Sequence, residues 1–228
     1  MKTILVTGGS GNLGQAVIRR FLEGGYQVVA TMIPNDPVKP DIKDDRFSTE
    51  IVDLMDEAAS AAFVGRLSRS GGIDAAVLTV GGFAMGSVVQ TSSADIARQY
   101  RLNFETAYHI ARPVFTEMLK QGSGRIFLIG SRPGSSMSLS KGMAAYGLAK
   151  SLLFRLAELM NEEAQGTDVV TSVVVPSTID TPQNRQAMAD SDFSKWVKPE
   201  AIAGVIHWYC STEARILREP VIKVYNNA

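Results

Sequence analysis

Tyr146 and Lys150 stand four residues apart in an alanine-rich stretch that predicts a helix, so both side chains share one helix face. A free phenol titrates near ~10, and proton transfer at neutral pH needs a lower value. With the ammonium ~5 Å from the phenolate and an effective dielectric of ~20, the attraction is about 3 kcal/mol, or roughly 2 pKa units. We therefore expect Lys150 to lower the pKa of Tyr146, and Tyr146 to act as a general acid or base.

A glycine-rich turn, Thr7 to Gly14, follows the first predicted strand and opens the first predicted helix. Its glycines satisfy the G-x-G-x-x-G pattern of dinucleotide binding. They permit a tight turn in which backbone N–H groups approach a pyrophosphate, and the helix N-terminus adds partial positive charge. The alternative is a turn without a ligand. The residues expected to bind the cofactor here are Gly8, Ser10, Gly11, Asn12, Leu13 and Gly14.

The end of the second predicted strand bears on the choice between NAD and NADP. A carboxylate normally stands there to bind the adenosine ribose, but this chain has Met32. Its absence tilts the expectation slightly toward NADP, whereas Asp36 could curl back and restore a preference for NAD. Asp53, which precedes Leu54 after the third strand, is placed either to hydrogen-bond the adenine or to cap the next helix.

Short β-branched runs alternate with amphipathic or alanine-rich segments. This predicts a single-domain α/β Rossmann fold over residues 1–228, a doubly wound seven-stranded parallel sheet with helices on both faces. The predicted strands are Thr3 to Thr7, Gln27 to Thr31, Phe47 to Val52, Ala75 to Val80, Arg125 to Ile129, Val169 to Val175 and Val221 to Val224. The predicted helices are Leu13 to Glu23, Glu57 to Arg69, Ser93 to Leu119, Ala144 to Ala164 and Pro199 to Cys210. Two segments are expected to be irregular, Pro34 to Asp45 and Pro176 to Trp196.

The composition excludes several classes of partner. Lys plus Arg and Asp plus Glu both count 23, so no charge excess favours nucleic acid or an anionic membrane, and a small-molecule substrate is the expectation. The apolar start is too short for a signal-peptide core, and no later run approaches a membrane span. With Cys210 as the single cysteine, these features predict a cytoplasmic protein without an intramolecular disulfide.

The chain resembles the short-chain dehydrogenases/reductases over essentially its whole length. The residues that carry the resemblance, besides the glycine-rich turn, are Asn103, Ser131, Tyr146 and Lys150. It implies an NAD(P)-dependent oxidoreductase in which Tyr146 transfers the proton and Lys150 also binds the cofactor ribose. It further implies that Ser131 orients the substrate carbonyl and that Asn103 holds a proton-relay water.

The spacing between Ser131 and Tyr146 is two residues longer than is usual in the family. The loop between them must therefore bulge. Ser135 or Ser136 could compete for the role of Ser131.

Two further segments extend the resemblance at the cofactor. Thr79-Val80-Gly81-Gly82 stands where the family has an Asn-Asn-Ala-Gly run. The segment from Pro176 to Thr181 is similar to the family's Pro-Gly segment, which implies that the Ile179 backbone and Thr181 lie near the nicotinamide carboxamide and the phosphates. The remaining implied cofactor contacts are Met32, Asp53, Leu54, Thr79, Gly81, Tyr146, Lys150, Pro176, Ile179 and Thr181.

The stretch from Thr178 to Trp196 resembles the dihydropteridine reductases, which implies quinonoid dihydropteridines as an alternative substrate. Those reductases do without the Ser and Asn that this chain keeps as Ser131 and Asn103. The leading expectation is therefore a carbonyl or alcohol substrate. A second alternative is a redox sensor that binds a dinucleotide without turnover, and the pairing of Tyr146 with Lys150 argues against it.

Residues 182–197 are expected to form a lid over the substrate. Phe83, Met188 and Trp196 would supply its apolar walls beside Ser131. A small core belonging to the lid itself is the alternative for these side chains. Arg185 is expected either to meet an anionic substrate or to pair with Asp190.

No metal site is expected, because His109 and His207 lack the spacing of metal ligands. The helices predicted over Ser93 to Leu119 and Ala144 to Ala164 resemble the family's dimer-forming pair. The resemblance therefore implies a homodimer or homotetramer.

Overall fold

The computed structural model describes residues 1–227 and contains a seven-stranded sheet in which every pair of neighbouring strands is parallel. The strand order is β3-β2-β1-β4-β5-β6-β7, which confirms the predicted doubly wound Rossmann architecture. The strands are β1 Thr3–Thr7, β2 Gln27–Met32, β3 Phe47–Ile51, β4 Ala75–Leu78, β5 Ser123–Ile129, β6 Asp168–Pro176 and β7 Val221–Val224.

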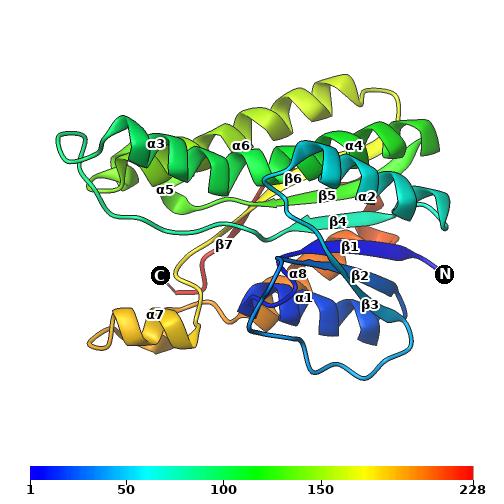
Figure 1. Cartoon of the computed structure of the whole chain (residues 1–228), viewed down its shortest axis with the longest axis horizontal. Helices are drawn as coiled ribbons and strands as arrows, with labels where there is room; N and C mark the ends of the chain where they lie inside the picture. The colour runs from blue at the N-terminus through cyan, green and yellow to red at the C-terminus, as the bar shows by residue number, and fades with distance from the viewer. Residues whose placement is uncertain (228) are drawn as a thin grey trace.

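Helices cover both faces of this sheet (Figure 1), with α1 and α8 on one face and α2, α4 and α6 on the other. Their bounds are α1 Asn12–Glu23, α2 Glu57–Arg69, α3 Ser93–Tyr100, α4 Thr106–Gln121, α5 Arg132–Ser135, α6 Ala144–Glu163, α7 Pro182–Ala187 and α8 Pro199–Tyr209. Short 3₁₀ turns span Met137–Ser140, Phe193–Lys195 and Glu213–Ile216, and a π-helical turn spans Arg101–Glu105.

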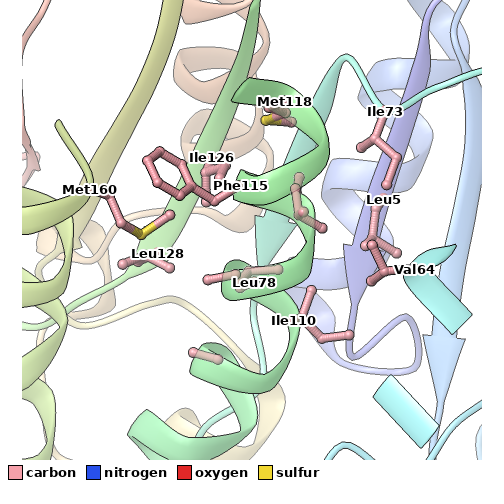
Figure 2. Packing of buried hydrophobic residues seen from close by; sticks show 14 of the residues in the cluster. Leu5, Val64, Ile73, Leu78, Ile110, Phe115, Met118, Ile126, Leu128 and Met160 are labelled. Carbon is pink, nitrogen blue, oxygen red and sulfur yellow. The ribbon is translucent and has the colours of Figure 1, made fainter. Parts of the chain in front are cut away.

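The sheet separates two hydrophobic cores, because successive side chains of a strand point to opposite faces. In β1, Leu5 belongs to the core beneath α2, α4 and α6, whereas Ile4 and Val6 belong to the core beneath α1 and α8. Figure 2 shows the first of these cores, where Ile110 and Met118 of α4 pack over the sheet. Burial on both faces explains why the central strands are nearly continuous apolar runs.

The helix predicted over Ser93 to Leu119 is not one regular α-helix. Ser92 begins α3 with a capping box, and the π-helical turn Arg101–Glu105 then separates α3 from α4. This turn contains Asn103, whose side chain is completely buried and bonds Gln99 one turn earlier. A π-helical turn inside an α-helix frequently marks a functional site.

The segment predicted to be irregular over Pro176 to Trp196 contains regular structure. Thr181 caps α7 by accepting a hydrogen bond from the Asn184 N–H, and Pro182 occupies the first helical turn. A Thr-Pro pair is a common helix start, so the sequence carried this signal. Helix α7 lies beyond the carboxyl ends of the strands (Figure 1).

Two structural findings bear on the expected setting of the protein. Among residues 1–227, no helix is long and apolar enough to cross a membrane. The same residues hold no group of three or more His, Cys, Asp or Glu side chains that could bind a metal ion.

Burial raises the pKa of the Cys210 thiol to about 12, so this thiol is unreactive at neutral pH.

The α4 side of the core yields a stability prediction. Ile110 is 0% exposed, so Ile110→Ala leaves a cavity and lowers the free energy of unfolding by about 2–5 kcal/mol. Ile216 is 85% exposed, and Ile216→Ala changes the same quantity by no more than about 0.5 kcal/mol. Urea unfolding followed by circular dichroism measures both variants. Equal losses in the two variants would show that the core is not where the structure places it.

Candidate active site

The glycine-rich turn between β1 and α1 forms a cradle that only glycine permits. A Cβ on Gly14 would lie 2.2 Å from the Gly8 carbonyl oxygen, and Gly8 itself has φ +68°. Gly11 precedes the first residue of α1 and caps it without a side chain, so the first N–H groups of the helix remain available to a ligand. Free N–H groups and the helix dipole suit the pyrophosphate of a dinucleotide.

A cleft of about 440 Å³ extends from this turn across the carboxyl ends of β2 and β4. It brings together most of the residues expected to bind a cofactor. Those that line it are Gly8, Ser10, Gly11, Asn12, Leu13, Gly14, Met32, Asp53, Leu54, Thr79, Gly81, Ile179 and Thr181. Three expected contacts do not line it, namely Pro176, which is buried at the end of β6, and the helix residues Tyr146 and Lys150.

Among residues 1–227, Asp36 and Asp53 are the charged side chains that line the cleft, and no Lys or Arg lines it. Asp36 curls back toward the glycine-rich turn and accepts a hydrogen bond of 2.6 Å from the Ser10 hydroxyl. Asp53 accepts from the Met55 N–H, whereas Asp56 caps α2 by accepting from the Ala59 N–H. The alternative that Asp53 caps this helix is therefore wrong.

Thr79 fixes the ends of two neighbouring strands. Its hydroxyl donates to the Thr7 carbonyl oxygen at 2.6 Å, and its N–H donates to the Thr7 hydroxyl at 3.1 Å. These bonds continue the pairing of β1 with β4 beyond Leu78, where β4 ends two residues earlier than predicted. The chain that follows is thereby free to turn toward the buried part of the site.

Lys150 of α6 is buried beneath the cleft and only 5% exposed. Its ammonium donates a hydrogen bond of 2.7 Å to the carbonyl oxygen of Ile129, the last residue of β5. Burial disfavours the charged form and lowers the pKa of Lys150 to about 8. At neutral pH the ammonium is therefore still the main form, held by a backbone acceptor in a dry environment.

Asn103 reaches the same place from the π-helical turn. Its Oδ1 accepts from the Gly82 N–H, and its amide nitrogen donates to the Gly82 carbonyl and to Gln99. A Cβ on Gly81 would lie 2.7 Å from Asn103 Oδ1 and 3.0 Å from Lys150 Nζ, so the glycine lets both groups approach one point. The amide nitrogen is occupied by protein acceptors, so the Asn103 side chain has a structural role, and its role in holding a proton-relay water stays a prediction.

Ser131 lies at the end of β5 and caps α5, where its Oγ accepts from the Gly134 N–H at 3.1 Å. A Cβ on Gly134 would lie 2.7 Å from the Lys150 Cβ, so this glycine allows the loop to pack directly on α6. The competing hydroxyls lie elsewhere, since Ser135 bonds the Arg132 carbonyl and Ser136 bonds Ser138. Helix α5 and the following 3₁₀ turn accommodate the two extra residues between Ser131 and Tyr146.

The expected direction of the Tyr146 pKa is wrong. Burial raises the pKa of the phenol above its usual value, and a hydrogen bond with Ser131 acts in the opposite direction. The Lys150 ammonium donates to the Ile129 carbonyl instead of the phenol, so it does not form the direct pair that was expected. A shared helix face thus brought the two side chains to one region without pairing them.

The three residues expected to line the substrate site have different surroundings. Phe83 is 61% exposed and its ring meets the Tyr146 ring edge-on, with centroids 5.1 Å apart. Met188 follows α7 and is 40% exposed. Trp196 is buried against Phe193, with centroids 4.8 Å apart, and lines a different pocket from the cofactor cleft. This surrounding favours the alternative in which Trp196 belongs to the lid's own core.

Helix α7 is connected to the glycine-rich turn. The Asn12 amide donates to the Gln183 side chain at 2.9 Å, across the mouth of the cleft. Arg185 forms two hydrogen bonds with Asp180, at 2.6 and 2.8 Å, and not the expected pair with Asp190. Asp180 immediately precedes the helix cap Thr181, so this ion pair fixes the base of α7.

Sequence reasoning missed several residues that line the cleft. They are Thr31, Ile33, Val52, Met55, Val80, Leu102 and Thr106. Most of them adjoin a predicted contact and were recoverable from their position at a strand end. Leu102 and Thr106 flank Asn103, and no sequence signal indicated that a π-helical turn would direct them into the cleft.

The known proteins that this chain resembles are consistent with this geometry. The family of short chain dehydrogenases matches residues 2–192. The cyclic-di-GMP-binding biofilm dispersal mediator protein of Escherichia coli is 30% identical over 220 residues, which cover 93% of this chain and 91% of that protein. The dihydropteridine reductase of Dictyostelium discoideum is 26% identical over 229 residues, which cover 97% of this chain and 94% of that protein.

A solved structure extends the similarity to three dimensions. An oxidoreductase of the short chain dehydrogenase/reductase family from Burkholderia thailandensis superposes with a TM-score of 0.83 at 25% identity, covering 98% of this chain and 90% of that one. Members of this family bind NAD(P) and small-molecule substrates. The chain therefore belongs to the short-chain dehydrogenase family and is an oxidoreductase.

Proposed function

We propose that this oxidoreductase transfers a hydride between NAD and a carbonyl or alcohol substrate, with Tyr146 as the group that donates or accepts the proton. The observation that carries the proposal is the convergence of Tyr146, Ser131 and Lys150 at the carboxyl end of β5, next to the dinucleotide cleft. Ligands of open α/β sheets bind at this edge.

The nicotinamide cofactor would supply or accept the hydride, held by the glycine-rich turn and the strand ends that line the cleft. The protein's own part is proton transfer at the substrate oxygen. Ser131 Oγ accepts from the Gly134 N–H, which leaves its one hydroxyl hydrogen free to donate either to the Tyr146 oxygen or to the substrate oxygen.

Lys150 would act on Tyr146 at longer range. Its buried ammonium favours a nearby phenolate whenever the phenol has given up its proton, because a low dielectric strengthens the attraction. The hydrogen bond to Ile129 occupies only one of its three hydrogens, so two remain for a bound ribose or a water. This role differs from the direct pairing expected from the sequence.

We infer NAD as the preferred cofactor, in place of the slight tilt toward NADP. Asp36 and Asp53 give the adenosine end of the cleft a negative charge, and no cation there offsets it. A ribose 2′-hydroxyl can donate to a carboxylate, whereas a 2′-phosphate would be repelled by it. The Ser10 hydroxyl holds the Asp36 carboxylate in place.

For the substrate, the retained Ser131 supports a carbonyl or alcohol over a quinonoid pteridine, although one relative is a dihydropteridine reductase. Another relative is described by the cyclic di-GMP it binds, which corresponds to the alternative of a dinucleotide-binding sensor. The buried Lys150 and the Ser131 hydroxyl beside Tyr146 support catalysis instead.

We also infer self-association through α6 and the neighbouring helices. Leu148 and Leu159 are 49% and 61% exposed along the outer side of α6. Apolar side chains repeated along one helix suit a helix–helix interface, here with a second copy of the chain. Residues 182–197 remain the proposed lid, with α7 as its helical part.

The first prediction concerns the proton-transfer group. Tyr146→Phe removes the phenol hydroxyl and keeps the ring, so turnover falls by at least about a thousandfold while NADH affinity changes less than about threefold. Tyr209→Phe in α8, on the opposite face of the sheet, is the control and keeps full activity. The oxidation of NADH with a panel of aldehydes and ketones measures turnover. NADH fluorescence measures the affinity for NADH.

Three outcomes contradict the assignment of function. Undiminished turnover by the Tyr146→Phe variant excludes the proposed proton donor. Oxidation of NADH by quinonoid dihydropterin alone supports the pteridine alternative. Tight binding of NADH or cyclic di-GMP without turnover of any substrate supports the sensor.

The second prediction concerns the cofactor. The wild-type protein binds NADH more tightly than NADPH, and Asp36→Asn lowers the Kd for NADPH by about tenfold because it removes the charge but keeps an acceptor for Ser10. Asp45→Asn, an exposed position in the same connection between β2 and β3, leaves both Kd values unchanged. Fluorescence titration at fixed ionic strength measures them. Tighter binding of NADPH by the wild-type protein would refute the inference.

The third prediction concerns pH and Lys150. Its folded pKa of about 8 lies below the usual value of 10.5, so burial destabilises the fold by its full amount below pH 8, and the penalty shrinks as the pH rises from 8 toward 10.5. The free energy of unfolding of the wild-type protein should therefore rise by about 2 kcal/mol between pH 8 and 9.5 relative to Lys150→Met. Subtracting one free energy of unfolding from the other removes the contribution of all other titrating groups.

Lys141→Met, which removes an exposed lysine, serves as the control and follows the wild-type curve. Urea unfolding at each pH measures the three proteins. Parallel curves for the wild-type and Lys150→Met proteins would show that burial does not lower the pKa of Lys150.

A further inference from the structure

Arg132 directly follows Ser131 and begins helix α5. Its side chain is partly buried, and its guanidinium lies over the ring of Tyr225 at 5.2 Å from the ring centroid. Within residues 1–227 this guanidinium forms no ion pair and no hydrogen bond, unlike Arg125, which bonds Asp168 through both terminal nitrogens. A guanidinium carries five N–H donors, and leaving them unused in a partly buried place is unfavourable.

The position of Tyr225 puts this guanidinium on the active-site side of the sheet. Tyr225 packs against the core beneath α6, and its carbonyl oxygen accepts from the Ser177 hydroxyl at 2.8 Å, just after β6 ends. The guanidinium therefore lies beyond the carboxyl ends of β5 to β7, on the same face as Tyr146. Because Arg132 follows Ser131 directly in the chain, it lies in the same loop as the side chain that hydrogen-bonds the Tyr146 hydroxyl.

The surroundings of Tyr146 complete the description of this region. Phe83 contributes an exposed aromatic ring against the Tyr146 ring, and Met137, in the 3₁₀ turn after α5, is 55% exposed. Such side chains suit a flat, apolar body. The unused donors of Arg132 suit an anionic end group, because the planar guanidinium matches the two oxygens of a carboxylate.

We propose that Arg132 is a specificity residue that binds a carboxylate of the substrate, while the carbonyl or hydroxyl of the same molecule lies at Tyr146. This inference rests on the proposed function. It narrows the substrate to aromatic or apolar oxo acids and hydroxy acids in which the two groups are separated by a short rigid body. Tyr225 holds the guanidinium in place by stacking, so the charge is positioned before the ligand arrives.

The test compares 4-formylbenzoate with its methyl ester, because both present the same aldehyde on the same ring. The wild-type protein should reduce the acid with a kcat/KM at least about tenfold above that of the ester. Arg132→Met, which retains an apolar stem to cover Tyr225, should lower kcat/KM for the acid by about ten- to a hundredfold, chiefly through KM, and leave the ester unchanged. Arg132→Lys should restore part of the preference, because it returns the charge without the planar fork.

Lys141→Met is the matched control, since it removes another cation from the connection between β5 and α6. It should leave the preference for the acid intact. Equal loss of acid and ester turnover in Arg132→Met would reveal a merely structural role and overturn the proposal. Equal turnover of acid and ester by the wild-type protein would overturn it as well, while leaving the proposed oxidoreductase function standing.

A binding measurement separates the proposal from catalysis. Benzoate should raise the thermal midpoint of the wild-type protein, benzamide should not, and Arg132→Met should lose the response to benzoate. A shift that depends on Arg132 supports the carboxylate site even if no aldehyde is turned over. If benzoate does not raise the thermal midpoint of a protein that still reduces the ester, the carboxylate site is wrong and the proposed oxidoreductase function stands.

Discussion

The buried hydrogen bond between the Lys150 ammonium and the Ile129 carbonyl is the contact on which the rest of the active site depends. A charged amine in a dry interior needs a strong acceptor, and the carboxyl end of a parallel strand offers a carbonyl at a fixed position. The bond fixes the rotation of α6 relative to β5. It thereby fixes the position of Tyr146, one helical turn earlier on the same face.

Close packing of backbone makes this arrangement possible. Gly134 lets the loop that carries Ser131 lie directly on α6, and Gly81 lets Asn103 and Lys150 approach one point. A side chain at either glycine would separate the groups whose proximity the chemistry requires. The π-helical turn has a related effect, because it displaces Asn103 from the regular helix toward Gly82. The polar centre is then enclosed by the two apolar cores that hold the sheet and helices in place.

Charge is distributed unevenly along the ligand-binding edge of the sheet. The first N–H groups of α1 offer positive potential where a pyrophosphate would lie, whereas Asp36 makes the adenosine end negative. At the far end, beyond β5 to β7, the guanidinium of Arg132 carries the positive charge. In the proposed function, each region attracts a different group, and electrostatics as well as shape orient the dinucleotide and the substrate relative to one another.

The sequence by itself determined the order of strands and helices and the identity of most residues around the cleft. Buried parallel strands are nearly continuous apolar runs, so β1 and β7 were predicted with their observed bounds, and the glycine-rich turn has a pattern set by local backbone geometry. Only the tertiary structure decided the partner of Lys150, the raised pKa of Tyr146 and the return of Asp36 toward Ser10. All three features depend on which groups lose water on folding and on which distant carbonyls and hydroxyls come within hydrogen-bonding distance. Residue spacing along one chain encodes neither the burial of a group nor its distant partners.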